Sequence, residues 1–257
     1  MKHWILYCQT LLTLTIFMSL PVSAYSLSPS IVELKSIGNE SSAFLRLENK
    51  GIKPAAVEFT INKHSKDLDG KAIQGEDAGD DFIIYPQQVV MMPGDEVTVQ
   101  VLWVGEPALD TEQSFTMFTR EIAIPHKTPV LPDSNDKVVF DITILMNYES
   151  RIYVTPLGAK SKTIVASVKQ DSSSAEPGPI EVILANQGTT HQSMSKMSLA
   201  FVPLNSAGIQ LKQQAITLDT EKIPAMRGHL LAGGQRRLLI PRPAELPLGK
   251  FDVILSE

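Results

Sequence analysis

Cysteine is almost absent from this sequence, and its single occurrence, Cys8, falls within the first 24 residues. Those residues carry a positive charge at Lys2, an apolar stretch that is densest at 11–20, and a Pro-Val-Ser-Ala run that ends at Ala24. A positive start, an apolar stretch and a small-residue cleavage site together are typical of a secretory signal peptide. We therefore expect residues 1–24 to be a signal peptide that is cleaved near Ala24. The mature chain would contain no disulfide bond and would depend on its hydrophobic core.

Long hydrophobic runs are also lacking after residue 24, so we expect no membrane insertion after signal cleavage. A membrane anchor is the alternative for residues 1–24, but their apolar stretch is short for a span and no flanking charge follows it. Positive charge is in the minority, with 23 Lys and Arg against 28 Asp and Glu and a net charge of −5. A mildly acidic chain has no general attraction for nucleic acid or anionic lipid. We therefore expect no nucleic-acid partner.

Catalytic motifs are missing as well. The sequence has no nucleophile elbow, phosphate loop or zinc-protease helix. Its five histidines are isolated from one another and show no metal-ligand spacing: His3, His64, His126, His191 and His229. The chain is therefore predicted to be no enzyme and to bind neither metal nor cofactor, and these absences argue against an exported enzyme on a β scaffold.

One acidic segment matches a metal-binding pattern in part. Its residues correspond to positions one, three, five, six and twelve of a calcium loop, and they are Ser65, Asp67, Asp69, Gly70 and Glu76. The first position of such loops is usually Asp, and no helical pattern flanks this segment. An Asp-x-Asp-Gly sequence between two strands is also a common polar turn. We favour the turn, with a calcium loop as the alternative.

Short strand patterns dominate what the sequence does contain. Alternating or β-branched runs occur at 43–47, 56–61, 82–85 and 97–101, and turns rich in Gly, Pro and Asn separate them. Helical periodicity is almost absent. Such a succession of short strands is typical of a β-sandwich or barrel. With 257 residues, 43% of them hydrophobic, the chain can form one large or two small domains.

Two turn signals occur twice. The segment 47–51 has an echo at 184–188, and the segment 91–95 has an echo at 231–235, at offsets of 137 and 140 positions. Nearly equal offsets predict two domains of the same topology, with a boundary near 156–158. Coincidence is the alternative, because glycine-containing turns are common in any β protein.

The segment 138–146 is predicted to be a long strand with an unbroken apolar row on one face. The row consists of Val138, Phe140, Ile142, Ile144 and Met146. Most rows of this kind are half-buried core strands. The alternative is a strand that offers its apolar row to another protein, and periodicity alone does not separate the two.

An ordered set of segments resembles the PapD-like periplasmic chaperones that assemble pili. The resemblance covers most of residues 27–156 and, more loosely, 157–257. It is carried by the segments 81–86 and 89–94, by Arg120-Glu121-Ile122 with Pro125, by the row 138–146 and by the segment 151–156.

This resemblance implies an all-β fold of two immunoglobulin-like β-sandwich domains in a boomerang arrangement. The amino-terminal domain would span 25–156 and the carboxy-terminal domain 157–257. In the family, one strand of the first domain completes a pilus subunit that lacks its own last strand, a form of strand addition. That donor strand corresponds to the row from Val138 to Met146, which would bind the subunit.

The family also anchors the subunit's terminal carboxylate with two basic residues. One of them corresponds to Arg151, whose two-pronged guanidinium suits a carboxylate. The other lies in the first strand, where this chain has Pro29-Ser30-Ile31. Ile31 cannot bind a carboxylate, so the resemblance is to a divergent branch. An exposed surface arginine is the alternative for Arg151.

The function implied is that of a periplasmic chaperone that binds pilus or fimbrial subunits and delivers them to an outer-membrane usher, without a cofactor. The alternative is a structural pilus subunit or adhesin with immunoglobulin-like domains. Such a subunit should lack its own last strand and often carries a disulfide. A mature chain with two complete sandwiches and no cysteine favours the chaperone.

Overall fold

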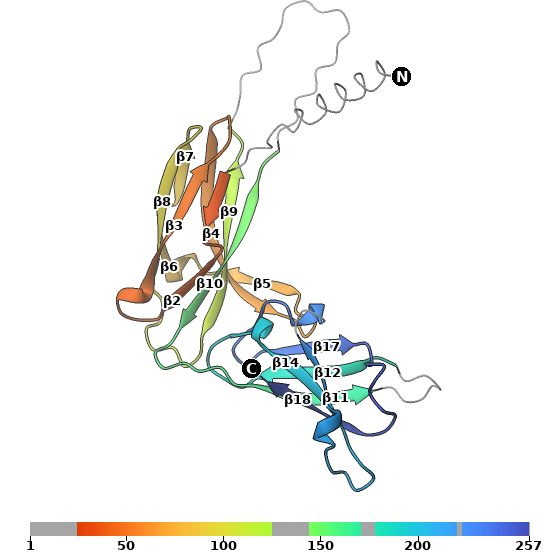
Figure 1. The fold of residues 1–257 in the computed structure, drawn as a ribbon. Helices are drawn as coiled ribbons and strands as arrows, with labels where there is room; N and C mark the ends of the chain where they lie inside the picture. Colours follow the sequence, from red (N-terminus) through yellow and green to blue (C-terminus); the bar gives the residue numbers. More distant parts are fainter. Residues whose placement is uncertain (1–24, 125–143, 171–177, 220–222, 257) are drawn as a thin grey trace, which may run out of the picture.

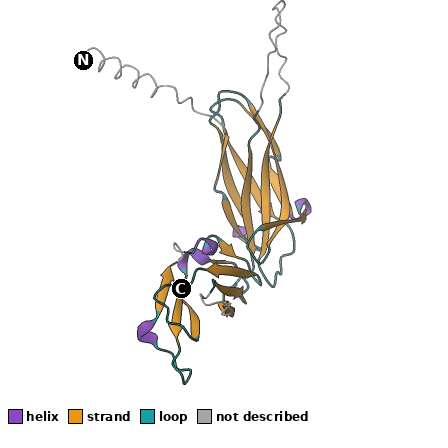
Figure 2. Ribbon diagram, turned by 90° about the vertical axis from the view of Figure 1, so that its right-hand side faces the viewer, coloured by secondary structure: helices purple, strands orange, loops and turns teal. Residues whose placement is uncertain are grey.

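The chain folds into two β-sandwich domains that meet end to end at an angle, as the computed structural model shows (Figures 1 and 2). The structure describes residues 25–124, 144–170, 178–219 and 223–256. Within these ranges the helices are single 3-10 turns: η1 (Asn39–Ser41), η2 (Gly79–Asp81), η3 (Met194–Lys196), η4 (Lys212–Gln214) and η6 (Pro224–Met226). No helix in the described part of the chain is long and apolar enough to span a bilayer.

The first domain contains two sheets. One sheet is antiparallel, in the order β1 (Tyr25–Ser28), β3 (Ser42–Asn49), β8 (Glu96–Trp103) and β6 (Phe82–Tyr85). The other, called the cleft sheet below, has the order β2 (Ile31–Lys35), β10 (Asn147–Thr155), β9 (Gln113–Ile122), β4 (Ala55–Lys66) and β5 (Ala72–Asp77). The short strand β7 (Gln88–Met91) pairs with the beginning of β4. Strands β2 and β10 run parallel, and the other pairs in the cleft sheet are antiparallel.

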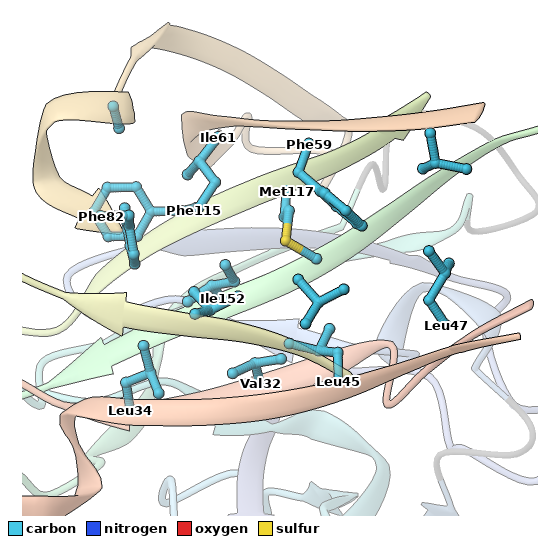
Figure 3. Close-up of a cluster of buried hydrophobic side chains, with 14 of the residues drawn as sticks. Val32, Leu34, Leu45, Leu47, Phe59, Ile61, Phe82, Phe115, Met117 and Ile152 are labelled. Carbon is cyan, nitrogen blue, oxygen red and sulfur yellow. The ribbon is translucent and has the colours of Figure 1, made fainter. Parts of the chain in front are cut away.

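Alternation along the strands builds the core of this domain (Figure 3). In β4, Val57, Phe59 and Ile61 are almost fully buried, and the residues between them are half-buried on the other face. They pack with the buried faces of the neighbouring strands, and the shared cluster includes Leu45, Leu47, Phe115, Met117, Ile152 and Val154. Each such side chain contributes about 1.5–3 kcal/mol by leaving water. A chain without disulfides obtains its stability in this way.

The second domain has a separate core and its own strands. One three-stranded sheet has the order β11 (Thr163–Gln170), β12 (Ile180–Asn186) and β17 (Gln235–Ile240). The other has the order β15 (Ile216–Asp219), β14 (Ser198–Pro203) and β18 (Phe251–Ser256). Strands β13 (Gln192–Ser193) and β16 (His229–Leu230) form a short pair. The core between them includes Ile180, Val182, Leu184, Leu199, Phe201 and Leu238.

A buried asparagine closes the first of the predicted repeated turns. The side-chain amide of Asn49 donates to the carbonyl oxygens of Lys53 and Met91, at 2.9 and 3.1 Å. Its Oδ1 accepts from the amide of Gly51, and its own backbone amide donates to the carbonyl of Asp95. One side chain thus joins two turns that are some 40 residues apart in the sequence.

Asn186 makes the same four bonds in the second domain. Its amide donates to the carbonyls of Thr190 and Leu230, its Oδ1 accepts from the amide of Gly188, and its backbone amide donates to Gly234. Both asparagines are almost fully buried, where an unpaired amide would be costly. The two echoed turns are therefore closed in the same way, by one buried asparagine in each domain.

Candidate functional site

The outer face of the cleft sheet is polar and yet largely buried where the second domain meets it. Thr116, His64, Glu112 and Tyr153 lie on this face and are between 1% and 9% exposed. Buried polar groups must find partners or pay for desolvation. Glu112 and Tyr153 find them across the domain boundary, and Thr116 finds one in Arg151.

Glu112 is the central acceptor of this boundary. Its carboxylate accepts hydrogen bonds from Thr155 at 2.9 Å, from Thr190 at 2.6 Å and from the backbone amide of His191 at 3.0 Å. The His191 Nδ1 atom lies 2.9 Å from both carboxylate oxygens. Burial alone would raise the pKa of Glu112, but the bonds from His191 and Thr190 hold it below its usual value. The carboxylate therefore stays charged and joins the two domains.

An aromatic cluster covers this carboxylate. The Tyr153 ring stacks on His191 at 4.1 Å, and His229 meets both rings edge-on, at 5.6 and 4.7 Å between centroids. The Tyr153 hydroxyl lies 3.4 Å from His229 Nδ1. Burial raises the pKa of Tyr153 to about 12 and lowers the pKa of His229. These rings pack the two domains together.

The acidic segment with calcium-loop spacing forms the hairpin turn between β4 and β5. Ser65 lies in β4 and Glu76 in β5. The Asp67 side chain accepts from the backbone amide of Lys71 at 2.8 Å, and Gly70 adopts a φ of +80° that favours glycine. The predicted turn is confirmed. Among the described residues, no group of three acidic, His or Cys side chains is placed to hold a metal ion.

The tip of this hairpin forms hydrogen bonds and an ion pair with β17 of the second domain. Asp69 pairs with Arg237 of β17 through two bonds of 2.8 Å, and the Arg237 backbone amide donates to the Leu68 carbonyl at 2.7 Å. The neighbouring Arg236 guanidinium lies against Gly70, where a Cβ atom would come within 1.8 Å of it. Glycine is therefore favoured at this position by its φ, and a Cβ atom there would also displace the Arg236 guanidinium.

Arg151 lies on the same outer face, as the predicted anchor. Its side chain is 24% exposed and donates to the Thr116 hydroxyl, with Glu149 at 3.5 Å. Strand pairing puts Ile31 directly beside it, and Ile31 is 42% exposed. Thus Arg151 carries a half-buried positive charge at the middle of the sheet, and its first-strand neighbour is apolar.

Two further basic residues on β4 were not singled out by the sequence. The predicted strand ended at 61, but β4 continues to Lys66, so period two carries His64 and Lys66 onto the outer face. The Lys66 Nζ donates to the His229 carbonyl at 3.1 Å. Burial and then the charges of Arg151 and Lys66 lower the pKa of His64 to about 4. A longer strand pattern, read through Asn62, would have revealed both residues.

The low pKa of His64 predicts a loss of stability in acid. An unfolded histidine takes up its proton near pH 6.5, whereas the folded protein resists protonation until about pH 4. The unfolded state binds more protons between these values, so the free energy of unfolding should fall by about 3 kcal/mol as pH drops from 6.5 to 4. Urea unfolding at pH 7, 5.5 and 4.5 measures this fall.

A His64→Leu variant isolates the histidine from other acid-sensitive groups such as Glu112. The difference in unfolding free energy between the variant and the unchanged protein should shift in favour of the variant by about 2 kcal/mol between pH 7 and 4.5. A difference that does not change with pH would contradict the assignment of this effect to His64.

Only part of the predicted donor row lies within the residues that the structure describes. Val138, Phe140 and Ile142 lie outside the described residues. Ile144 is 71% exposed, whereas Met146 is half-buried and packs against the core of the first domain. The described strand β10 begins at Asn147, after the predicted row ends.

Strand β10 changes its surroundings along its length. Ile152 and Val154 share the face of the predicted row and are fully buried in the core. Toward Ile144 the same face emerges from the sandwich. On its edges, β10 pairs with β9 throughout 147–154, but β2 covers only 151–155. In the described part of the chain, no strand pairs with the second edge of 147–150.

Comparison with known proteins gives a fold and no sequence relative. No protein-family profile and no curated protein matches the chain. The fold is similar to the Class 5 fimbriae chaperone CfaA, with 11% identity and a TM-score of 0.56 over 91% of this chain and 99% of that chain. A chain of a chaperone–tip adhesin complex of CFA/I fimbriae has 12% identity and a TM-score of 0.54, over 86% and 90% of the two chains.

A third similar structure comes from the CsuC–CsuE chaperone–tip adhesion subunit pre-assembly complex of the archaic chaperone-usher Csu pili of Acinetobacter baumannii. It has 15% identity and a TM-score of 0.52, over 90% of this chain and 97% of that chain. At such identities the likeness is one of fold. The chain has the two-domain β-sandwich fold of pilus chaperones, and the predicted fold class is confirmed.

Proposed function

We propose that this protein is a periplasmic chaperone that binds pilus or fimbrial subunits by donating a strand to them. The observation that carries the proposal is the edge of β10 at 147–150, with which no strand in the described part of the chain pairs. This segment continues into the exposed Ile144 on one side and leads to the half-buried Arg151 on the other. Strand addition with carboxylate capture requires three features that follow one another along the chain: an apolar row, an unpaired backbone edge and a cation.

The donor row in this proposal is Val138, Phe140, Ile142, Ile144 and Met146, and Arg151 is the anchor of the subunit's terminal carboxylate. An incomplete sandwich exposes an apolar groove and unpaired backbone groups, which favour aggregation. A donated strand pairs those backbone groups and fills the groove with alternate side chains. No chemical step is involved, and fold similarity to pilus chaperones supports a protein that is no enzyme.

The cellular setting follows from the same proposal. Residues 1–24 would direct the chain to the periplasm and be cleaved near Ala24, and the loaded chaperone would deliver its subunit to an outer-membrane usher. The alternative, a structural subunit or adhesin, is disfavoured because β10 completes the cleft sheet of the first domain between β2 and β9. A subunit that awaits a donated strand would have a gap there.

Purification of the full-length, carboxy-terminally tagged chain from the periplasm of its own host tests this function. We expect a co-purified exported protein whose sequence falls one strand short of a complete sandwich. Removing the last residues of that partner should abolish its capture. A partner with a complete sandwich, or a tagged chain that is recovered alone while pili are assembled, would contradict the proposal.

A further inference from the structure

The strand that pairs with Arg151 on its β2 side supplies no second cation beside it. Ile31, which pairs with Arg151 across the β2–β10 ladder, has no charge and no hydrogen-bonding side chain. A terminal carboxylate has two oxygens and binds best where several donors converge. A second basic ligand for the carboxylate of the proposed function must therefore come from a different strand.

The register of the cleft sheet directs Arg151 toward β4. Thr116 of β9 pairs with Arg151 on one side and with Asn62 of β4 on the other, so the three side chains share one row of the outer face. The Arg151 guanidinium donates to the Thr116 hydroxyl, so it reaches from β10 over β9. Lys66 follows Asn62 by four positions on the same face of β4.

Lys66 is a half-buried cation without an acidic partner. Its Nζ donates to the neutral His229 carbonyl, and among the described residues no carboxylate lies within ion-pair distance of it. Burial, then the charges of Arg236 and Arg151, hold the pKa of Lys66 below its usual value. Like charges held together in a partly desolvated cleft repel each other, and a bound anion would relieve that repulsion.

The two arginines of β17 at this boundary have acidic neighbours, unlike Lys66. Arg237 pairs with Asp69. Burial lowers the pKa of Arg236, but the nearby Asp67 and Asp69 counter that effect, and the guanidinium is held against Gly70. The acidic Glu112 is occupied by His191 and its threonine partners. Among the described Lys and Arg side chains of this boundary, Lys66 is the one whose pKa Arg151 lowers and that has no acidic neighbour.

We propose that Lys66 is the second basic ligand of the partner's terminal carboxylate, so that β10 holds the carboxylate through Arg151 and β4 holds it through Lys66. This inference rests on the proposed function. In the absence of a partner, the hydrogen bond to the His229 carbonyl holds the ammonium group at the domain boundary. Binding replaces that single bond to a neutral oxygen by one to a charged oxygen, which adds the attraction between opposite charges to the hydrogen bond.

Capture of the partner from the periplasm tests the inference with four variants of the full-length chain. Lys66→Met removes the charge and keeps much of the aliphatic stem, so we expect at least a tenfold loss of captured partner. Lys66→Arg restores the charge and should retain at least half of the capture. Lys53→Met removes a lysine charge from an exposed turn far from the cleft and should capture as the unchanged protein does. Arg151→Met serves as the reference for the anchor itself.

Comparison of partner capture by these variants separates the role of Lys66 from the proposed chaperone function. Full capture by Lys66→Met, with loss by Arg151→Met, would overturn the role of Lys66 and leave the proposed function intact. Full capture by both variants would overturn the carboxylate anchor and the role of Lys66 together. Equal loss by Lys66→Met and Lys66→Arg would show that shape at this position, rather than charge, is required, and would also overturn the inference.

A measurement on the unchanged protein covers the case in which Lys66→Met does not fold. Acetate is titrated into the isotope-labelled free protein, with acetamide as a neutral control, and the side-chain NMR signals of Arg151 and Lys66 are followed. We expect both signals to shift along one acetate binding curve and neither to shift with acetamide. An acetate-dependent shift at Arg151 alone, or two separate curves, would overturn the role of Lys66.

Discussion

An Arg151→Ala variant is expected to fold as the unchanged protein does and to capture no partner. Its side chain contributes one bond to Thr116 and a weak ion pair to Glu149, so the free energy of unfolding should change by about 1 kcal/mol or less. Loss of a charge-assisted pair in a partly desolvated cleft costs about 2–5 kcal/mol of binding. That range corresponds to a loss of affinity between about thirtyfold and several thousandfold. Co-purification of the partner and the thermal midpoint of the free protein measure the two effects.

Arg46→Ala is the matched control for this variant. Arg46 lies on β3 in the sheet opposite the cleft, and its side chain is 58% exposed beside Glu48 and Glu96. It loses the same charge at a site remote from the cleft, so capture should be unchanged. If Arg151→Ala captures as much partner as Arg46→Ala does, Arg151 is a surface arginine and the carboxylate anchor is lost from the proposal.

The sequence predicted the architecture well because local patterns repeat in it. The echo of 47–51 at 184–188 marked two buried asparagines, and the structure shows that Asn49 and Asn186 close equivalent turns with the same four bonds. Strand alternation at 97–101 likewise corresponds to the inner strand β8. These features depend on neighbours a few residues apart, and such patterns are visible in a single sequence.

The domain boundary could not be predicted in the same way, because its contacts join residues that are distant in the sequence. Glu112 and His191 are 79 positions apart, and Asp69 and Arg237 are 168 positions apart. Each member of these pairs looks like an ordinary surface residue until both domains are placed. The acidic hairpin shows this clearly, since its turn was predictable and its partner on β17 was not.

The candidate site was predicted in part. Arg151 was found through the resemblance, and its half-buried place on the cleft sheet agrees with a binding role. Lys66 was missed because the strand pattern weakens after Ile61, where Asn62, Lys63 and His64 interrupt the apolar alternation. A polar face that is buried under a second domain shows no hydrophobic pattern in the sequence. A strand predicted from alternating hydrophobicity alone therefore ends before the real strand does.

The predicted donor row can be tested by two substitutions that share one face of the chain. Ile144 is 71% exposed, whereas Ile152 lies eight positions further on the same face and is fully buried in the core. Ile152→Asp should therefore unfold the protein, because it buries an unpaired charge. Ile144→Asp should fold normally, with a change in unfolding free energy of about half a kcal/mol or less. Urea unfolding of both variants shows whether the row leaves the core between these residues.

Capture of the partner by the same variants then tests whether Ile144, at the exposed end of the row, contacts the subunit. In the donor-strand proposal, Ile144 enters an apolar groove of the subunit, and a charge there should collapse binding although the free protein is intact. Leu145→Asp is the matched control, since Leu145 is 42% exposed and adjoins Ile144 in the sequence but does not belong to the predicted row. We expect a soluble, folded Ile144→Asp protein that no longer protects its subunit from degradation, beside a Leu145→Asp protein that still does. An unfolded Ile144→Asp variant would place the row in the protein's own core, and equal capture by both variants would remove the strand donation from the proposed function.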